Sequence, residues 1–165
     1  MKKSSAPARK RRQAPAPSLP VASCIRVGPS GVHGTGAFAA RALPALTFLG
    51  FYEGRRYAAV EAAAIRWDGQ LTYLAMLSNG DVIDGSEGGN ATRFLNHSCD
   101  PNCEAFEDED RAGRPVFRFQ TLRAVAAGEE LSVDYGLEAD DGSTAADYPC
   151  HCGAATCRGT LLAPD

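Results

Sequence analysis

The side chains best suited to chemistry are concentrated in residues 93–102, whose sequence is RFLNHSCDPN. Polar donors and acceptors follow an apolar pair directly here, and such groups are costly to bury without hydrogen-bond partners. The thiol of Cys99 can serve as a metal ligand only if other thiolates approach it. Three further thiols, those of Cys150, Cys152 and Cys157, follow later in the chain.

These three later cysteines lie within eight residues in a C-x-C-x4-C pattern, which is typical of zinc binding. Zinc prefers four thiolate or imidazole ligands, so a fourth must come from elsewhere. Cys99, Cys103 and Cys24 are candidates, whereas His151 is poorly placed between two of the ligands. Disulfides are the alternative, but no segment resembles a secretion signal, and metal binding is favoured.

Two further motifs flank residues 93–102, which we call the central stretch. Residues 32–40 (VHGTGAFAA) contain Gly34 and Gly36, and residues 128–135 (GEELSVDY) end in Tyr135. The glycine pair alone is weak evidence, because glycines mark any tight turn and this pair lacks the spacing of a dinucleotide-binding loop.

In this order and spacing, the glycine pair, RFLNHSCDPN, GEELSVDY and the cysteine pattern followed by Arg158-Gly159 resemble a SET-domain protein lysine methyltransferase with a post-SET zinc-binding tail. The resemblance covers roughly residues 22–162. It implies S-adenosyl-L-methionine as the methyl donor and Zn²⁺ as a structural ion. It also implies a lysine side chain of a basic protein or peptide, such as a histone or histone-like protein, as the acceptor.

The resemblance also assigns roles to individual residues. Tyr135 is the leading catalytic residue, whose hydroxyl would orient the amine and the methyl group, and Tyr52 would line the lysine channel. The implied zinc ligands are Cys99, Cys150, Cys152 and Cys157, which tie the tail to the central stretch. The implied cofactor-binding residues are His33, Gly34, Gly36, Tyr73, Arg93, Asn96, His97 and Tyr135.

Several of these roles have structural alternatives. Tyr52 and Tyr73 could each be core aromatics with satisfied hydroxyls. For Arg93 a structural role is favoured over a catalytic one. The residue that limits the number of methyl groups stays open between Val133 and Phe106.

Two other functions compete with the enzyme. One is a non-catalytic SET module that binds basic peptides, and the intact motifs argue against it. The other is a zinc-stabilised nucleic-acid-binding protein, for which contact through the basic tail would be non-specific at most. All three lysines lie in the first ten residues, so any automethylation must fall there, for example on Lys10, or on the terminal amine.

Length and charge bound the organisation of the 165 residues. Residues 1–20 hold six of the 17 basic residues and no acidic one, so the rest carries a net charge of about −9. We expect a disordered basic tail at 1–20, a SET domain at 21–137, and a linker with the post-SET tail at 138–165. No apolar run is long enough for a membrane span, so the expected location is cytoplasmic, or nuclear in a eukaryote.

The expected fold is mostly β: a SET-domain (β-clip) fold of small curved sheets with one short helix and a pseudoknot that interlaces the central stretch with the strand before Tyr135. The helix is expected at 57–67 and an exposed acidic hairpin tip at 104–110. Strands are expected at 24–27, 47–54, 71–77, 81–84, 116–120, 122–125 and 131–135.

Overall fold

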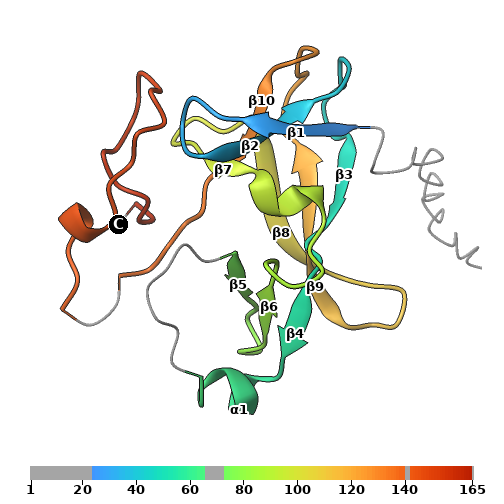
Figure 1. Cartoon of the computed structure of the whole chain (residues 1–165), viewed down its shortest axis with the longest axis vertical. Helices are drawn as coiled ribbons and strands as arrows, with labels where there is room; N and C mark the ends of the chain where they lie inside the picture. Colours follow the sequence, from blue (N-terminus) through green and yellow to red (C-terminus); the bar gives the residue numbers. More distant parts are fainter. Residues whose placement is uncertain (1–23, 66–72, 140–141, 165) are drawn as a thin grey trace, which may run out of the picture.

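The structure, a computed structural model, describes residues 24–65, 73–139 and 142–164. Within these ranges the chain forms mainly short strands in three sheets, with one short α-helix (Figure 1). The prediction of a mostly-β fold of small sheets is confirmed. The predictions for residues 1–20, including Lys10, fall outside the described residues.

The first sheet brings distant parts of the chain together. Its strands are β1 (Ile25–Pro29), β2 (Thr35–Ala39), β10 (Glu130–Val133) and β7 (Asn96–His97), in the order β1-β2-β10-β7. β10 pairs antiparallel with β2 and parallel with β7. The central stretch and the strand before Tyr135 therefore lie side by side, as predicted.

The second sheet has the order β3-β9-β8, from β3 (Phe48–Phe51), β9 (Pro115–Thr121) and β8 (Cys103–Glu109). The prediction of a hairpin tip at 104–110 is wrong, because most of this acidic run forms β8 and pairs with β9 along its whole length. The turn itself is 110–114. Acidic side chains are tolerated in β8 because it is an edge strand, where charge faces solvent.

The third sheet consists of β4 (Arg55–Tyr57), β6 (Val82–Asp84) and β5 (Leu74–Met76), in the order β4-β6-β5. The strands predicted at 71–77 and 81–84 correspond to β5 and β6, which pair antiparallel as a hairpin. Gly80 in its turn has φ +84°, a backbone conformation that favours glycine. The part of the predicted strand at residues 71 and 72 lies outside the described residues.

The helix α1 is one turn, Ala59–Ala62, rather than the predicted 57–67, of which residues 66 and 67 lie outside the described residues. Val60 of this turn is 79% exposed, and Ala62 is its buried residue. Alanine propensity alone does not sustain a longer helix without an apolar face to bury. In the part of the chain that the structure describes, no helix combines the length and apolarity needed to cross a membrane.

The predicted strand at 122–125 is also wrong. Only an isolated bridge between Leu43 and Val125 forms there. Val125 is buried in the main core beside Leu43, whereas Leu122 is 44% exposed.

The core lies between the first two sheets. Its buried residues include Ala37 and Leu131 of the first sheet and Leu49 and Phe119 of the second. The segment that enters β7 packs on the same core through Leu95. The polar side chains of β7 are thus held on a rigid base.

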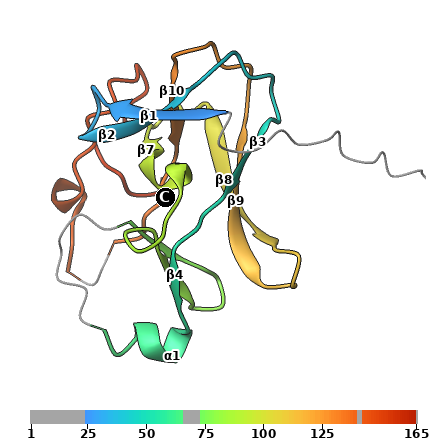
Figure 2. The same ribbon diagram turned by 45° about the vertical axis from the view of Figure 1, so that its right-hand side comes forward.

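The C-terminal segment lies beside the first sheet, close to β7 and the β1–β2 hairpin in both views (Figures 1 and 2). It contains a short 3-10 helix, Ala145–Asp147. Two isolated bridges give it shape, Leu137 with Leu162 and Pro149 with Thr160. The tail therefore folds back onto the segment that leaves β10.

Candidate active site and metal centre

Asn96 connects β7 to the segment around Gly34 and Gly36, residues 30–36, which we call the glycine loop. Its side chain is buried, and Nδ2 donates to the backbone oxygens of His33 and Thr35, at 3.2 Å each. The structure thus brings together three of the predicted cofactor residues: Asn96, His33 and, within the same loop, Gly34. Gly34 has φ +46° and open space around the position of a Cβ, so the loop backbone is accessible there.

His97 joins the metal centre to the backbone of Tyr135. Its Nδ1 accepts the Tyr135 N–H at 3.2 Å, and its Nε2 lies 3.3 Å from the Cys99 sulfur. Because Nδ1 acts as an acceptor, the ring proton is on Nε2, and the Nε2–H donates a hydrogen bond to the Cys99 sulfur. Burial lowers the pKa of His97, which favours this neutral form. The 3.5 Å approach of Nδ1 to Asp134 is therefore not an ion pair.

Tyr135 lies two residues past the end of β10. Its hydroxyl donates to the Leu95 carbonyl at 3.1 Å, and its ring meets the His97 ring edge-on, with centroids 5.4 Å apart. Although 43% of the residue surface is exposed, the phenol oxygen is held against the chain. Desolvation raises the pKa of Tyr135 to about 12. The phenol therefore stays protonated at neutral pH.

Tyr52 packs against the core and donates its hydroxyl to the Tyr73 carbonyl at 2.7 Å. This is the satisfied hydroxyl of the structural alternative. Burial, followed by the nearby Tyr135 phenol, raises the pKa of Tyr52 well above its ordinary value. A Cβ on Gly85 would come within 2.7 Å of the Tyr52 oxygen, so glycine there makes room for this tyrosine.

Arg93 packs beside Tyr52 and Tyr73 and is surrounded by aromatic rings. Its Nη1 donates to the Gly85 carbonyl at 2.7 Å, and its guanidinium lies 5.5 Å from the Tyr73 ring and 4.6 Å from the Phe94 ring. The rings of Tyr73 and Phe94 meet edge-on at 5.8 Å. Through these contacts Arg93 links the Gly85 carbonyl to the Tyr73 and Phe94 rings.

The four cysteines predicted to bind zinc are gathered in one place. The sulfur atoms of Cys99, Cys150, Cys152 and Cys157 all lie within 4.8 Å of one another. All four are free thiols, and the Cys99 and Cys150 sulfurs are 3.8 Å apart, too far for a disulfide. Burial disfavours the thiolate of Cys152, but N–H donors from Cys99 and Ala154 lower its pKa to about 6.

The rival ligands lie elsewhere. Cys103 is fully buried, its sulfur lies 3.3 Å from the Asn102 Oδ1, and burial raises its pKa to about 12. Cys24 is buried beside the Arg41 guanidinium. His151 is exposed and is not part of the cluster.

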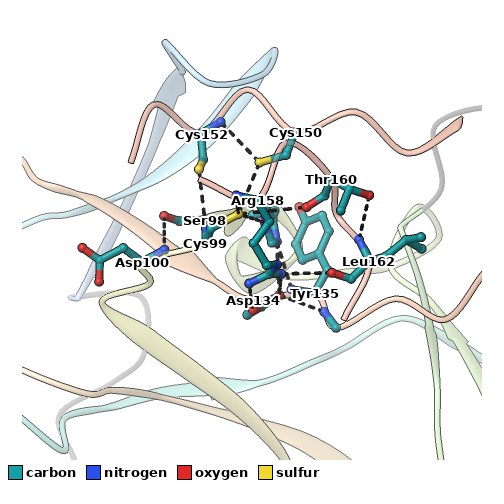
Figure 3. A network of polar contacts seen from close by, with 12 residues as sticks. Ser98, Cys99, Asp100, Asp134, Tyr135, Cys150, Cys152, Arg158, Thr160 and Leu162 are labelled. Carbon is teal, nitrogen blue, oxygen red and sulfur yellow. Dashed lines mark hydrogen bonds and ion pairs between the residues drawn. The ribbon is translucent and has the colours of Figure 1, made fainter. Parts of the chain in front are cut away.

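Arg158 holds the tail against the strand end that carries Tyr135 (Figure 3). Its guanidinium donates to both oxygens of Asp134, at 2.7 and 2.9 Å, and to the Leu162 carbonyl at 3.2 Å. Its backbone N–H points to the Cys99 sulfur at 3.4 Å. One residue thus contacts the metal centre, the tail and the segment beside Tyr135.

A cavity of about 240 Å³ opens between the glycine loop and the tail. Val32, His97, Ser98, Glu130 and Cys152 contribute to its wall, and Tyr135 does not. Tyr135 instead meets the His97 ring edge-on and donates its hydroxyl to the Leu95 carbonyl.

The two candidates for limiting methyl addition differ in position. Val133 is buried in the core, whereas Phe106 is 37% exposed on β8. Sequence reasoning did not assign roles to four residues that contact predicted site residues: Ser30 contacts His33, Glu130 contacts Asn96, Asp134 approaches His97, and Arg158 contacts Cys99. Glu130 and Asp134 lie within residues 128–135, and Arg158 directly follows the cysteine pattern. Their places in these motifs could have indicated a role.

Residues 34–136 match the family model of the SET domain, so the chain belongs to the SET-domain family. It is 35% identical over 133 residues to Histone-lysine N-methyltransferase 2B of Homo sapiens, covering 78% of this chain and 5% of that protein. It is 32% identical over 143 residues to the Histone-lysine N-methyltransferase, H3 lysine-4 specific, of Chaetomium globosum, covering 83% and 13%. It is 43% identical over 102 residues to Histone-lysine N-methyltransferase Su(var)3-9 of Drosophila pseudoobscura pseudoobscura, covering 56% and 16%. The chain therefore spans only a small part of each of these relatives.

Proposed function

We propose that this chain is a protein-lysine N-methyltransferase that uses S-adenosyl-L-methionine. The observation that carries the proposal is the convergence of the glycine loop, Asn96 and Tyr135 on the β7–β10 pair, within a SET domain. The names of its relatives, all histone-lysine N-methyltransferases, support the same reaction.

The residues around β7 fit the methyl donor. Gly34 leaves backbone accessible, Asn96 holds the loop, and the Tyr73 phenol lies near enough to contribute to the raised pKa of Tyr135. Aromatic faces and oxygen atoms suit a positively charged sulfonium. His33, Gly36, Arg93 and His97 complete the set that would surround it. S-adenosyl-L-methionine supplies an electrophilic methyl group when bound.

The four thiols fit a structural Zn²⁺ ion. A set of four cysteines leaves no position open for water, which is typical of structural sites. The His97 ring would orient the Cys99 ligand through its Nε2–H, as partners of metal ligands commonly do. The ion would fix the tail beside the Tyr135 segment.

Tyr135 would orient the acceptor amine. Its hydroxyl is protonated at neutral pH and fixed by Leu95, so it is a poor base but a well-placed dipole. Lysine titrates near about 10.4 in water, and both desolvation and a nearby cation favour its neutral form. The contribution of Tyr135 is thus alignment of the nitrogen behind the methyl group.

Tyr52 would act behind Tyr135 in the same wall. Its hydroxyl is committed to the Tyr73 carbonyl, so it would shape the channel without touching the amine. The aromatic surface of Tyr52 and Tyr73 would exclude water from the lysine.

The substrate we propose is a basic protein or peptide that carries lysine, with histones as one candidate. Residues 21–165 carry a net charge of about −9, which favours association with a basic partner. Self-methylation by the same chemistry would fall on Lys10 or its neighbours in the tail, because the chain has lysine only at positions 2, 3 and 10.

The test is direct. The purified full chain, loaded with zinc, is incubated with methyl-labelled S-adenosyl-L-methionine and a panel of basic proteins, and the label is located by mass spectrometry. Label on lysine side chains supports the proposal. Binding of basic proteins without any label, under conditions where the methyl donor is bound, would instead favour a non-catalytic peptide-binding module.

A further inference from the structure

We propose that Glu130 is a positioning residue whose carboxylate fixes both Asn96 and the glycine loop in the arrangement that binds S-adenosyl-L-methionine. The inference rests on the proposed function. It concerns a residue to which the resemblance gave no role.

The Glu130 carboxylate lies where three segments meet. Its Oε1 accepts the Ser30 hydroxyl at 2.7 Å and the Asn96 Nδ2–H at 2.9 Å. Glu130 is the first residue of β10, Asn96 is the first residue of β7, and Ser30 follows β1 directly. One oxygen atom therefore links the loop to both central strands.

Ser30 in turn binds the backbone of the glycine loop. Its hydroxyl oxygen accepts the N–H groups of Val32 at 2.9 Å and His33 at 3.2 Å. Its own N–H donates to the Gly34 carbonyl at 2.9 Å. The turn from residue 30 to 34 is thus closed around a side chain that Glu130 holds in place.

The carboxylate also sets which end of the Asn96 amide faces the loop. Nδ2 has two hydrogens and faces three acceptors: the carbonyls of His33 and Thr35 at 3.2 Å, and Glu130 at 2.9 Å. The charged acceptor makes the shortest of the three contacts and forms the strongest type of hydrogen bond. A charged acceptor excludes the flipped amide, so Asn96 directs its Oδ1 away from the loop.

The Glu130 side chain also explains why residue 36 is a glycine. A Cβ on Gly36 would run into the Glu130 carboxylate and lie 2.9 Å from the Ser30 Cβ. By contrast, a Cβ on Gly34 would meet open space. The two glycines therefore differ in purpose: Gly34 allows a left-handed backbone at an open position, and Gly36 lets Glu130 reach Ser30 and Asn96.

The charge of Glu130 also affects the ionisation of Tyr135. Its negative charge is one of the causes that raise the pKa of Tyr135. A fixed negative charge beside the loop favours a positively charged ligand there.

The experiment measures the dissociation constant of S-adenosyl-L-methionine by calorimetry on the zinc-loaded full chain. The variants are Glu130→Ala, Glu130→Gln and Ser30→Ala, and the control is Glu138→Gln, which removes one charge at an exposed site after the same strand. We expect Glu130→Ala to weaken binding by about tenfold or more, because it removes a charged hydrogen bond. Glu130→Gln retains an acceptor and should lose less, and the control should match the wild type.

Two further readouts separate positioning from general stability. Amide hydrogen exchange at residues 32–36 should accelerate in Glu130→Ala and Ser30→Ala, and the Michaelis constant for the lysine substrate at saturating methyl donor should not change. Ser30→Ala serves if Glu130→Ala does not fold. Wild-type affinity and wild-type exchange in folded Glu130→Ala or Ser30→Ala would overturn the inference, whereas a wild-type protein that binds no methyl donor would overturn the proposed function.

Discussion

The Arg158 guanidinium binds both carboxylate oxygens of Asp134, at 2.7 and 2.9 Å, one residue before Tyr135. Both side chains are mostly shielded, with 23% and 32% of their surfaces exposed. Burial opposes the charge on Asp134, yet its pKa falls below the ordinary value because the bonds from Arg158 and from the Gly136 N–H together outweigh that effect. This pair attaches the cysteine-rich tail to the segment that carries the proposed catalytic tyrosine.

Replacing Arg158 should therefore loosen the tail. Arg158→Ala removes a two-point charged contact, and we expect the zinc-loaded protein to lose about 1–2 kcal/mol of unfolding free energy in urea. The matched control is Arg114→Ala, which breaks the exposed pair with Asp110 and should cost less. Equal effects of the two substitutions would contradict a special role for Arg158.

Zinc removal should release the tail and leave the sheets folded. Elemental analysis should give about one zinc ion per chain, and chelation should speed amide exchange at residues 150–162 far more than in the core strands. Cys157→Ser should lower zinc content, because it removes one of the four gathered thiols.

The rival cysteines provide the control for this prediction. Cys24→Ala and Cys103→Ala should reduce stability, because both side chains are buried, while zinc content stays unchanged. A variant at either position that loses zinc, or a wild-type protein without zinc that keeps its tail protected, would show that the ligand set is wrong.

The resemblance to the SET family implied the meeting of β7 with β10 and the choice of Cys99 as the fourth ligand, whereas the residues alone indicated metal binding by Cys150, Cys152 and Cys157. The extent of α1 and the position of the acidic run could not be obtained in this way. Alanine favours a helix at 57–67, but Val60 is exposed and α1 stays one turn long. Residues 104–109 form a strand because β9 pairs with them. Glu130 was overlooked because its partners, Ser30 and Asn96, are far away in sequence.

Acid should destabilise the protein partly through Glu129. The hydrogen bond from Arg123, which is the main cause, holds the pKa of Glu129 at about 2, below its ordinary value of 4.5. A carboxyl with a lowered pKa in the folded state gives stability that is present above pH 4.5 and is lost as the pH falls towards 2.

Comparison of urea unfolding at pH 6 and pH 3 would check this. Glu129→Gln should be less stable than the wild type at pH 6 and should lose less stability on acidification. Glu138→Gln, at an exposed position, should retain the wild-type pH dependence. If Glu129→Gln loses as much stability as the wild type between these two conditions, the contribution assigned to Glu129 is absent.

Turnover of Tyr135→Phe, measured beside its affinity for S-adenosyl-L-methionine, tests the central claim most directly. The substitution removes only the hydroxyl that now bonds to the Leu95 carbonyl. We predict that methyl transfer to a lysine substrate falls by about a hundredfold or more, while the methyl donor binds within a factor of about three of the wild-type affinity. Near-normal turnover in this variant would contradict the account, because the phenol would then have no part in aligning the amine.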